Sequence, residues 1–163
     1  MSEKKPKIVV FDLDYTLWPF WVDTHVTPPF KKDSNKKIVD AHNHVIRYYP
    51  DTPEILKQLV EQGFEVGVAS RTSEIKGANQ LLNLFGWEKY IKYKEIYPGT
   101  KTTHFSRIKN ESGVEYKDMI FFDDEQRNIS DLVKIGVLSI LVRDGVSHKV
   151  VQDGLTEFAS RKG

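Results

Sequence analysis

Short apolar runs recur along the chain, and each of them ends at a polar residue. The runs are rich in β-branched and aromatic residues, which is typical of strands buried in a parallel sheet. Strands are therefore predicted over residues 7–12, 64–70, 119–124 and 137–143, with a fifth and less sharply bounded strand over 90–98.

Apolar residues spaced three and four positions apart predict helices between these strands. The helices are expected within residues 50–63, 72–86, 101–113, 128–136 and 148–162, and Gly154 is expected to interrupt the last of them. Helices that alternate with strands indicate parallel βαβ units. The predicted fold class is therefore α/β, a doubly wound parallel sheet of Rossmann type, in one domain that spans residues 1–163.

Residues 18–50 break this alternation. They include several prolines and a lysine-rich patch but no convincing helical pattern, and a plain loop of that length is uncommon in a compact domain. We interpret the segment as a small β-hairpin flap, with residues 21–26 and 37–46 as its arms and the string FKKDSNKK (30–37) as its turn. The insert is too short for a folded cap domain.

Composition narrows the choice of partners and compartment. Lysine and arginine total 24 against 23 acidic residues, a formal net charge of +1, so neither nucleic acid nor an anionic membrane is expected as a partner. The chain has no cysteine, which excludes disulfides, cysteine-based zinc sites and thiol nucleophiles. Without a signal peptide, a membrane-spanning run or a coiled-coil stripe, we expect an intracellular, cytoplasmic monomer.

Polar residues gather at the predicted strand ends. In parallel α/β sheets, ligands bind beyond the carboxyl ends of the strands, and there the sequence places Asp12, Asp14, Ser70, Arg71, Asp123 and Asp124, with Lys101 at a helix start. Two carboxylates from different strands can hold Mg²⁺, a hard cation that takes oxygen ligands. An aspartate can attack phosphorus to form an aspartyl-phosphate, a second acid can protonate the leaving group, and serine and lysine can stabilise the phosphoryl charge.

Each of these residues also has a purely structural interpretation. Asp12 and Asp14 can belong to a solvated turn, and Ser70 can cap the following helix, a role for which Thr72 competes. Lys101 can be an ordinary surface lysine. Asp124 can be structural, since adjacent side chains on a strand point in opposite directions.

Four strings in order favour the chemical interpretation. FDLDYTL, at residues 11–17, resembles the first motif of the haloacid dehalogenase (HAD) superfamily of phosphohydrolases, and VGVAS, ending at Ser70, is similar to the second. Lys101 matches the third motif and FFDDEQRN the fourth. Longer strings, among them FDLDYTLWPFWVDTHV and SRTSEIKGANQLL, resemble the eukaryotic magnesium-dependent phosphatase family within it, and the similarity runs through nearly the whole chain.

The resemblance implies a role for each motif residue in catalysis and metal binding. Asp12 is expected as the nucleophile and a Mg²⁺ ligand, and Asp14 as the general acid and base, which also gives its backbone carbonyl to the metal. Asp123 is expected as the remaining carboxylate ligand, with Asp124 as a supporting hydrogen-bond partner. The implied reaction is hydrolysis of phosphomonoesters through an aspartyl-phosphate.

The resemblance also implies a set of substrate contacts. Ser70 and Lys101 are expected to hold the phosphoryl oxygens beside Asp12 and Asp14, and Lys101 also to restrain the nucleophile. Leu13 and Arg71 are expected to contribute through backbone or side chain. Trp21 is expected to reach the substrate from the flap.

The spacing of the motifs predicts an open site. Between Ser70 and Lys101 a helix and a strand already fill the chain, so no cap domain is expected there. An open site admits phosphotyrosine on a protein as well as a phosphorylated sugar adduct of the fructosamine-6-phosphate type, and the resemblance implies both. Two other functions use the same sheet: a phosphotransferase and a non-catalytic phospho-acceptor module.

Overall fold

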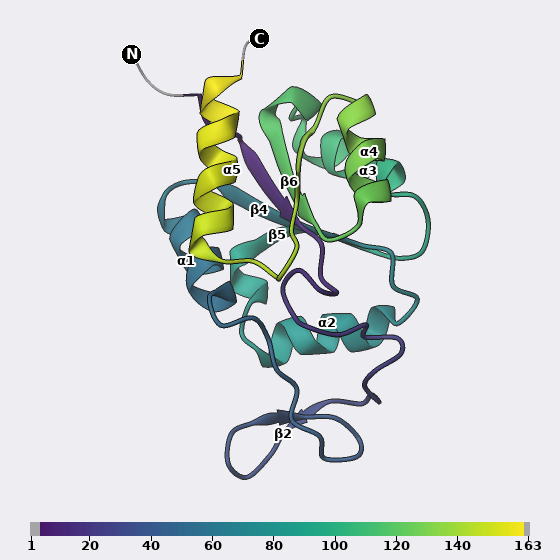
Figure 1. The fold of residues 1–163 in the computed structure, drawn as a ribbon. Coiled ribbons are helices and arrows are strands. Elements are labelled where there is room, and N and C mark those ends of the chain that lie inside the picture. The colour runs from purple at the N-terminus through teal and green to yellow at the C-terminus, as the bar shows by residue number, and fades with distance from the viewer. Residues whose placement is uncertain (1–3, 162–163) are drawn as a thin grey trace.

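The computed structural model describes residues 4–161, and a five-stranded parallel sheet forms its centre (Figure 1). The strands lie in the order β5-β4-β1-β6-β7. Their bounds are β1 Ile8–Phe11, β4 Glu65–Ser70, β5 Ile91–Ile96, β6 Met119–Asp123 and β7 Leu138–Leu141. All pairs are parallel, and the strand order runs outward from β1 in both directions, to β4 and β5 on one side and to β6 and β7 on the other. This order confirms the doubly wound α/β class.

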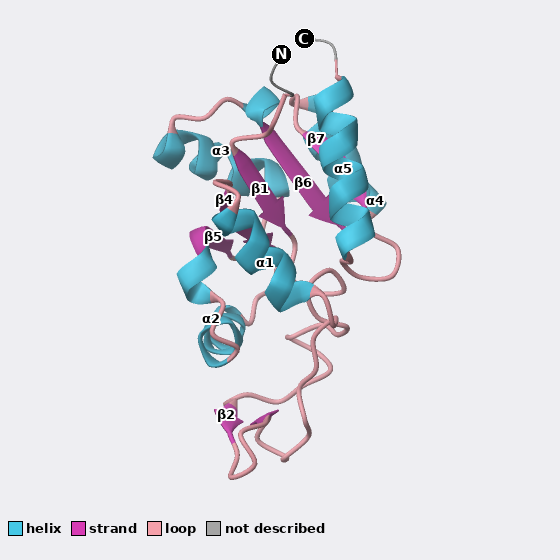
Figure 2. Cartoon of the chain, turned by 90° about the vertical axis from the view of Figure 1, so that its left-hand side faces the viewer, coloured by secondary structure: helices cyan, strands magenta, loops and turns pink. Residues whose placement is uncertain are grey.

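Helices cover both faces of the sheet. Helices α3 and α4 cover one face and α1 and α5 the other, so that in Figure 2 the second pair lies in front of the strands. The bounds are α1 Thr52–Glu61, α2 Ile75–Leu84, α3 Lys101–Ser112, α4 Gln126–Lys134 and α5 His148–Ser160. Two single-turn 3₁₀ helices, Glu88–Tyr90 and Tyr116–Asp118, precede β5 and β6. No helix within residues 4–161 is both long and apolar enough to span a membrane.

The sequence of β1 is an unbroken apolar run because this central strand contacts the core on both faces of the sheet. Val9 and Phe11 point into the core beneath α1 and α5, where Phe11 stacks on Phe122 with ring centroids 5.3 Å apart. Ile8 and Val10 point into the core beneath α3 and α4. Because both faces are covered, every residue of the strand is buried, as expected for a parallel sheet.

Helix α5 corrects one expectation, because Gly154 does not interrupt it. The helix is continuous through this position. A Cβ atom on Gly154 would lie 2.7 Å from Cζ of Phe122, so the glycine lets the helix approach the sheet closely. Glycine in a helix costs about 1 kcal/mol relative to alanine, and the close packing of α5 on Phe122 offsets this cost.

The flap contains a hairpin, but its arms differ from those predicted. Strand β2 (Lys31–Lys32) pairs antiparallel with β3 (Ile38–Val39), so the first arm lies inside the string expected to be the turn. Residues 21–26 form local turns instead. The cause is Asp33, whose carboxylate accepts hydrogen bonds from the backbone N–H groups two and four residues later and so closes a tight turn.

A buried carboxylate holds the flap together. Asp40 accepts hydrogen bonds from the backbone N–H groups of Thr27, His42 and His44, at 3.1, 3.0 and 3.0 Å. Burial alone would raise the pKa of Asp40, but these three donors outweigh it and hold the pKa below its usual value. The ionised carboxylate therefore joins the start of the flap to its end.

We expect Asp40→Ala to loosen the flap without unfolding the sheet. The three N–H groups lose their acceptor, so backbone amides of residues 27–45 should exchange with solvent roughly tenfold faster or more in hydrogen-exchange measurements at neutral pH. Because the folded pKa is lowered, the stabilisation is complete above the ordinary carboxyl pKa of about 4 and is lost as the pH falls through the folded value. The control is Asp33→Ala, whose effect should stay within the hairpin turn. Unchanged protection in Asp40→Ala would contradict this role.

Candidate active site

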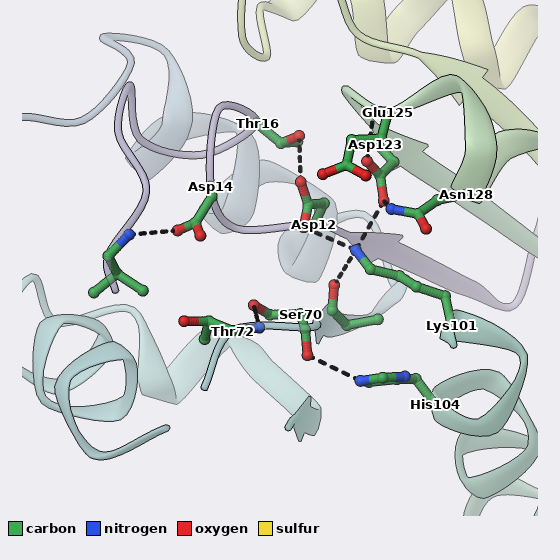
Figure 3. A network of polar contacts seen from close by, with 12 residues as sticks. Asp12, Asp14, Thr16, Ser70, Thr72, Lys101, His104, Asp123, Glu125 and Asn128 are labelled. Carbon is green, nitrogen blue, oxygen red and sulfur yellow. Dashed lines mark hydrogen bonds and ion pairs between the residues drawn. The ribbon is translucent and has the colours of Figure 1, made fainter. Parts of the chain in front are cut away.

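Residues predicted from four separate segments meet at one edge of the sheet (Figure 3). Asp12 follows β1, Ser70 ends β4, Asp123 ends β6 and Lys101 begins α3. A pocket of about 250 Å³ opens beside them. Six of the predicted residues line it, namely Asp12, Asp14, Trp21, Ser70, Arg71 and Lys101. The side chain of Leu13 is fully buried in the core, so only its backbone can serve the site.

Lys101 is a buried cation, not a surface lysine. Its side chain is 1% exposed, and Nζ lies 2.8 Å from Asp12 Oδ1, 2.8 Å from Asp123 Oδ2 and 2.7 Å from the carbonyl oxygen of Ala69. All three ammonium protons thus have an acceptor. Burial alone would lower the pKa of Lys101, but the charges of Asp12 and Asp123 outweigh it and raise the pKa above its usual value.

Three carboxylates form a cluster that fits a divalent cation. Oxygens of Asp12, Asp123 and Asp124 lie within 4.8 Å of one another, while Lys101 supplies a single positive charge to the first two. Burial and the Asp12 charge raise the pKa of Asp123. Burial, followed by its contact with Asp12, raises the pKa of Asp124 to about 9. The raised pKa values show that these crowded carboxylates are hard to ionise together, and a bound Mg²⁺, which prefers carboxylate oxygens, would favour their ionised forms.

Asp124 lies where a supporting residue is expected, with its side chain in hydrogen-bond contact with Asp12. Its carboxylate also belongs to the group of three that could hold a metal ion, which we did not predict. Asp124 lies just beyond the last residue of β6, so the alternation of side chains along a strand no longer applies to it. The chain turns here as the Asp123 carboxylate accepts a hydrogen bond from the backbone N–H of Glu125.

The side chain of Asp14 faces away from the cluster and toward the flap. Its carboxylate accepts hydrogen bonds from Trp18 Nε1 at 2.8 Å and from the backbone N–H of Val22 at 3.2 Å. Burial is the main cause that raises the pKa of Asp14 to about 7, with the Asp12 charge adding to it. Two carboxyl groups two residues apart thus have different surroundings. Directly after Asp14 the chain turns toward the flap, with Tyr15 in a left-handed backbone conformation at φ 58°.

The end of β4 presents donors to the pocket. Ser70 Oγ accepts a hydrogen bond from the backbone N–H of Thr72 at 3.2 Å. Neither residue caps α2, because Glu74 is the N-cap and its carboxylate accepts from the backbone N–H of Gly77. Within residues 4–161, buried Nε of Arg71 has no hydrogen-bond partner. A hydroxyl and a guanidinium nitrogen thus remain at the pocket for an anionic ligand.

The aromatic residues of the first loop separate into core and pocket. Trp18 and Phe20 are buried and stack on each other. Trp21 is 48% exposed, stacks on His25 with centroids 5.1 Å apart and meets the Tyr15 ring edge-on. The flap residue expected to face the substrate therefore lies at the pocket, held by two other rings.

Three residues that we did not predict support the motif side chains. Thr16 Oγ1 donates to Asp12 Oδ2 at 3.2 Å, and Asn128 Nδ2 donates to Asp123 Oδ2 at 3.0 Å. The third is His104, which is fully buried. The sequence offered one signal for each of two of them. His104 lies three residues after Lys101, on the same side of the predicted helix, and Thr16 lies two residues after Asp14.

His104 joins the end of β4 to the start of α3. Its Nε2 lies 2.9 Å from the carbonyl oxygen of Ser70 and 2.8 Å from that of Tyr97, and Nδ1 lies 3.0 Å from that of Thr100. The imidazole stacks on the Tyr97 ring with centroids 4.2 Å apart. The backbone of one phosphate-binding candidate is thereby fixed relative to the helix that carries Lys101.

We expect His104→Phe to impair phosphate binding, because phenylalanine keeps the stack on Tyr97 but contacts no carbonyl. Small displacements of catalytic groups cost up to about a hundredfold in rate. We expect kcat/KM to fall roughly ten- to a hundredfold and the inhibition constant of inorganic phosphate to rise. The melting temperature of the variant is measured as well, to separate this effect from a loss of stability. His104→Gln, which retains a donor, should recover part of the loss, and Tyr97→Phe serves as the stacking control. Unchanged phosphate inhibition in His104→Phe would assign His104 to stability alone.

Comparisons with known proteins agree with this geometry. The profile of the family described as Acid Phosphatase matches residues 4–161. The chain is 53% identical over 154 residues to Magnesium-dependent phosphatase 1 from Homo sapiens, covering 94% of this chain and 88% of that protein. It is 45% identical over 143 residues to an HAD-like hydrolase superfamily protein from Schizosaccharomyces pombe, covering 81% and 83% of the two chains. In fold, it resembles an HAD-superfamily hydrolase from Ehrlichia chaffeensis with TM-score 0.68 and 14% identity, over 96% of this chain and 98% of that one.

Proposed function

Because the chain belongs to the acid phosphatase family and is a magnesium-dependent phosphatase of the HAD superfamily, we propose that it hydrolyses phosphotyrosine in proteins through an aspartyl-phosphate on Asp12. One observation carries the mechanism. Asp12 and Asp14 line the same pocket, but only Asp12 belongs to the carboxylate cluster. The two residues are therefore suited to different steps.

Asp12 is suited to attack phosphorus. Lys101 holds one of its oxygens and Thr16 the other, so the carboxylate is oriented before the substrate arrives. Mg²⁺, which Asp12, Asp123 and Asp124 would hold, supplies positive charge that lets a phosphate approach this nucleophile. A bond forms between the Asp12 oxygen and phosphorus while the bond from phosphorus to the leaving oxygen breaks.

Asp14 is suited to move the protons of both steps. Burial raises the pKa of its carboxyl group to about 7, so near neutral pH both the protonated and the ionised forms are present, and the protonated form can donate a proton to the departing oxygen. The resulting carboxylate then takes a proton from water, which attacks the aspartyl-phosphate and restores Asp12. Ser70 and Arg71 supply donors for the phosphoryl oxygens.

The mouth of the pocket supports an aromatic, protein-borne substrate. Trp21 is half-exposed and held by His25 and Tyr15, so it offers a planar surface to a phosphorylated ring. Within residues 4–161, the chain forms the sheet, its helices and the flap, and no second domain covers the pocket. A phosphate on a large substrate can therefore reach Asp12.

A substrate panel tests the proposal. Phosphotyrosine and phosphoserine peptides, a fructosamine 6-phosphate and p-nitrophenyl phosphate should be compared with Mg²⁺ and with EDTA, and we expect the highest kcat/KM for phosphotyrosine. A higher value for the sugar adduct would replace this substrate assignment. Phosphate transfer to added glucose instead of water would indicate a phosphotransferase, and no turnover with Mg²⁺ would indicate a non-catalytic phospho-acceptor.

We expect Asp14→Asn to separate the two steps. Without a proton donor, kcat should fall about 10²–10⁴-fold for alkyl phosphates and less for p-nitrophenyl phosphate, whose leaving group needs no proton. Because water is not activated, a hydroxylamine-sensitive phosphoprotein should accumulate in rapid-quench experiments. The control is Asp23→Asn, since Asp23 is exposed and lines the same pocket. Equal losses on aryl and alkyl substrates would refute the role of Asp14.

A further inference from the structure

The flap carries positive charge that the rest of the chain does not share. Residues 31–47 contain five basic and two acidic residues, whereas the whole chain has a net charge of only +1. Both acidic residues, Asp33 and Asp40, use their carboxylates on backbone N–H groups of the flap itself. Within residues 4–161, none of the five basic residues forms an ion pair.

These cations border a groove with an apolar floor. The groove has a volume of about 460 Å³ and lies between the hairpin and the C-terminal end of α2. Its basic side chains are Lys32, Lys36, Lys37 and Arg47. Val45 and Tyr48 line it while 43% and 38% exposed, and Tyr48 packs edge-on against Phe85 with ring centroids 5.1 Å apart. Exposed apolar side chains bordered by unpaired cations suit a partner that is both acidic and partly apolar.

Helix α2 sets the distance between this groove and the active-site pocket. Thr72 lines the pocket and lies just before the helix, whereas Leu84, the last residue of the helix, lines the groove. Ten helical residues span about 15 Å, which an extended peptide covers in about five residues. The flap lies across this helix (Figure 1), where the backbone N–H of Phe30 donates to Gln80 Oε1 at 2.6 Å. Pocket and groove thus share one rigid support.

We propose that this groove docks an acidic segment of the protein substrate, about five residues from the phosphotyrosine. The inference rests on the proposed function, because it names the kind of protein that the active site serves. An acidic peptide fits better than a nucleic acid, since the floor combines aliphatic side chains with one exposed ring and has no series of stacking aromatics. It also fits better than a membrane, since the basic side chains border a concave groove.

Two variants of the protein test the docking, one that neutralises the groove and one control that loses the same charge elsewhere. The groove variant combines Lys32→Gln, Lys36→Gln and Lys37→Gln. The control combines Lys57→Gln, Lys117→Gln and Lys134→Gln, three exposed lysines that form no ion pair within residues 4–161 and lie on other elements. Both variants lose the same charge, so general electrostatic effects cancel.

Two measurements judge the variants. In the first, kcat/KM is compared for a phosphotyrosine peptide with glutamates about five residues away and for the same peptide with glutamines there. Exposed ion pairs contribute a few-fold each, so we expect the parent chain and the control to prefer the acidic peptide about tenfold and the groove variant to lose this preference. In the second, fluorescence anisotropy measures how tightly the acidic peptide binds when it carries no phosphate. This binding should be about tenfold weaker for the groove variant than for the parent chain, and it should also weaken when the salt concentration is raised.

The outcomes separate the docking from the proposed function. If the phosphotyrosine peptides are cleaved without preference, and the unphosphorylated acidic peptide binds both variants equally, the groove assignment is wrong while the function stands. If phosphotyrosine is not cleaved, the function is wrong, and anisotropy alone decides whether the groove binds acidic peptide. Tighter binding of a single-stranded oligonucleotide or of phosphatidylserine vesicles than of the peptide would overturn the choice of partner.

Discussion

Replacing Asp12 by asparagine is expected to lower kcat roughly 10⁴-fold or more, because removing a nucleophile leaves only the binding and electrostatic contributions to the rate. Asparagine has nearly the same shape as aspartate but cannot form the aspartyl-phosphate. The reaction with p-nitrophenyl phosphate measures the loss, since this substrate does not need the acid Asp14. No hydroxylamine-sensitive phosphoprotein should be detected at any time.

The effect of Asp12→Asn on the fold needs its own measurement. The substitution removes a charge that Lys101 contacts at 2.8 Å, so the melting temperature must show that the variant is folded under assay conditions. Thr16→Val serves as the comparison, because it removes the hydrogen bond that orients Asp12 but keeps the nucleophile, and it should lose at most about a hundredfold in rate, far less than Asp12→Asn. Turnover that persists unchanged in Asp12→Asn would rule out the covalent mechanism.

Replacing Lys101 by methionine is expected to reduce stability and activity together. The buried ammonium lies between Asp12 and Asp123, and removing one partner of a buried ion pair costs about 3–5 kcal/mol because the remaining charges stay buried and unpaired. The substitution also removes a positive charge that stabilises the transition state, which should lower kcat by about 10²–10³-fold. The control Lys94→Met removes a partly exposed pair with Glu88, which contributes about 0–1 kcal/mol.

Magnesium should distinguish the electrostatic explanation from a simple packing defect in Lys101→Met. Without the lysine, the carboxylates of Asp12, Asp123 and Asp124 have no cation, so Mg²⁺ should raise the melting temperature of the variant more than that of the parent chain. Thermal unfolding with EDTA and with Mg²⁺ gives this difference directly. An equal rise in both proteins would mean that the lysine does not share its carboxylates with the metal.

The sequence predicted the central part of this molecule because local and long-range signals coincide there. The apolar run of β1 needs no further context, since a strand buried on both faces consists of apolar residues throughout. Its polar end, with Asp12 and Asp14, falls where parallel sheets bind ligands. The pocket accordingly brings together Asp12, Ser70 and Lys101, although they lie far apart in the sequence.

The remaining features depend on contacts that no local pattern contains. Gly154 stays helical because the Phe122 ring lies against it, a contact between distant residues. The hairpin arms follow from the hydrogen bonds of Asp33, which the apolar spacing does not reveal. His104 was missed because a histidine surrounded by carbonyl oxygens looks, in the sequence, like any other polar residue of a weakly amphipathic helix.

The central position of β1 has a consequence during synthesis on the ribosome. The strand is made first, but its two neighbours, β4 and β6, are made much later. At about 5–20 residues per second, β6 follows β1 by roughly 5–20 seconds. Until β4 is made both edges of β1 are unpaired, and from then until β6 is made one edge stays free. The carboxylate cluster is also incomplete during this time, because Asp123 ends β6. We therefore expect chaperones that recognise extended apolar segments to bind the nascent chain at Ile8–Phe11 and to release it once β6 has paired.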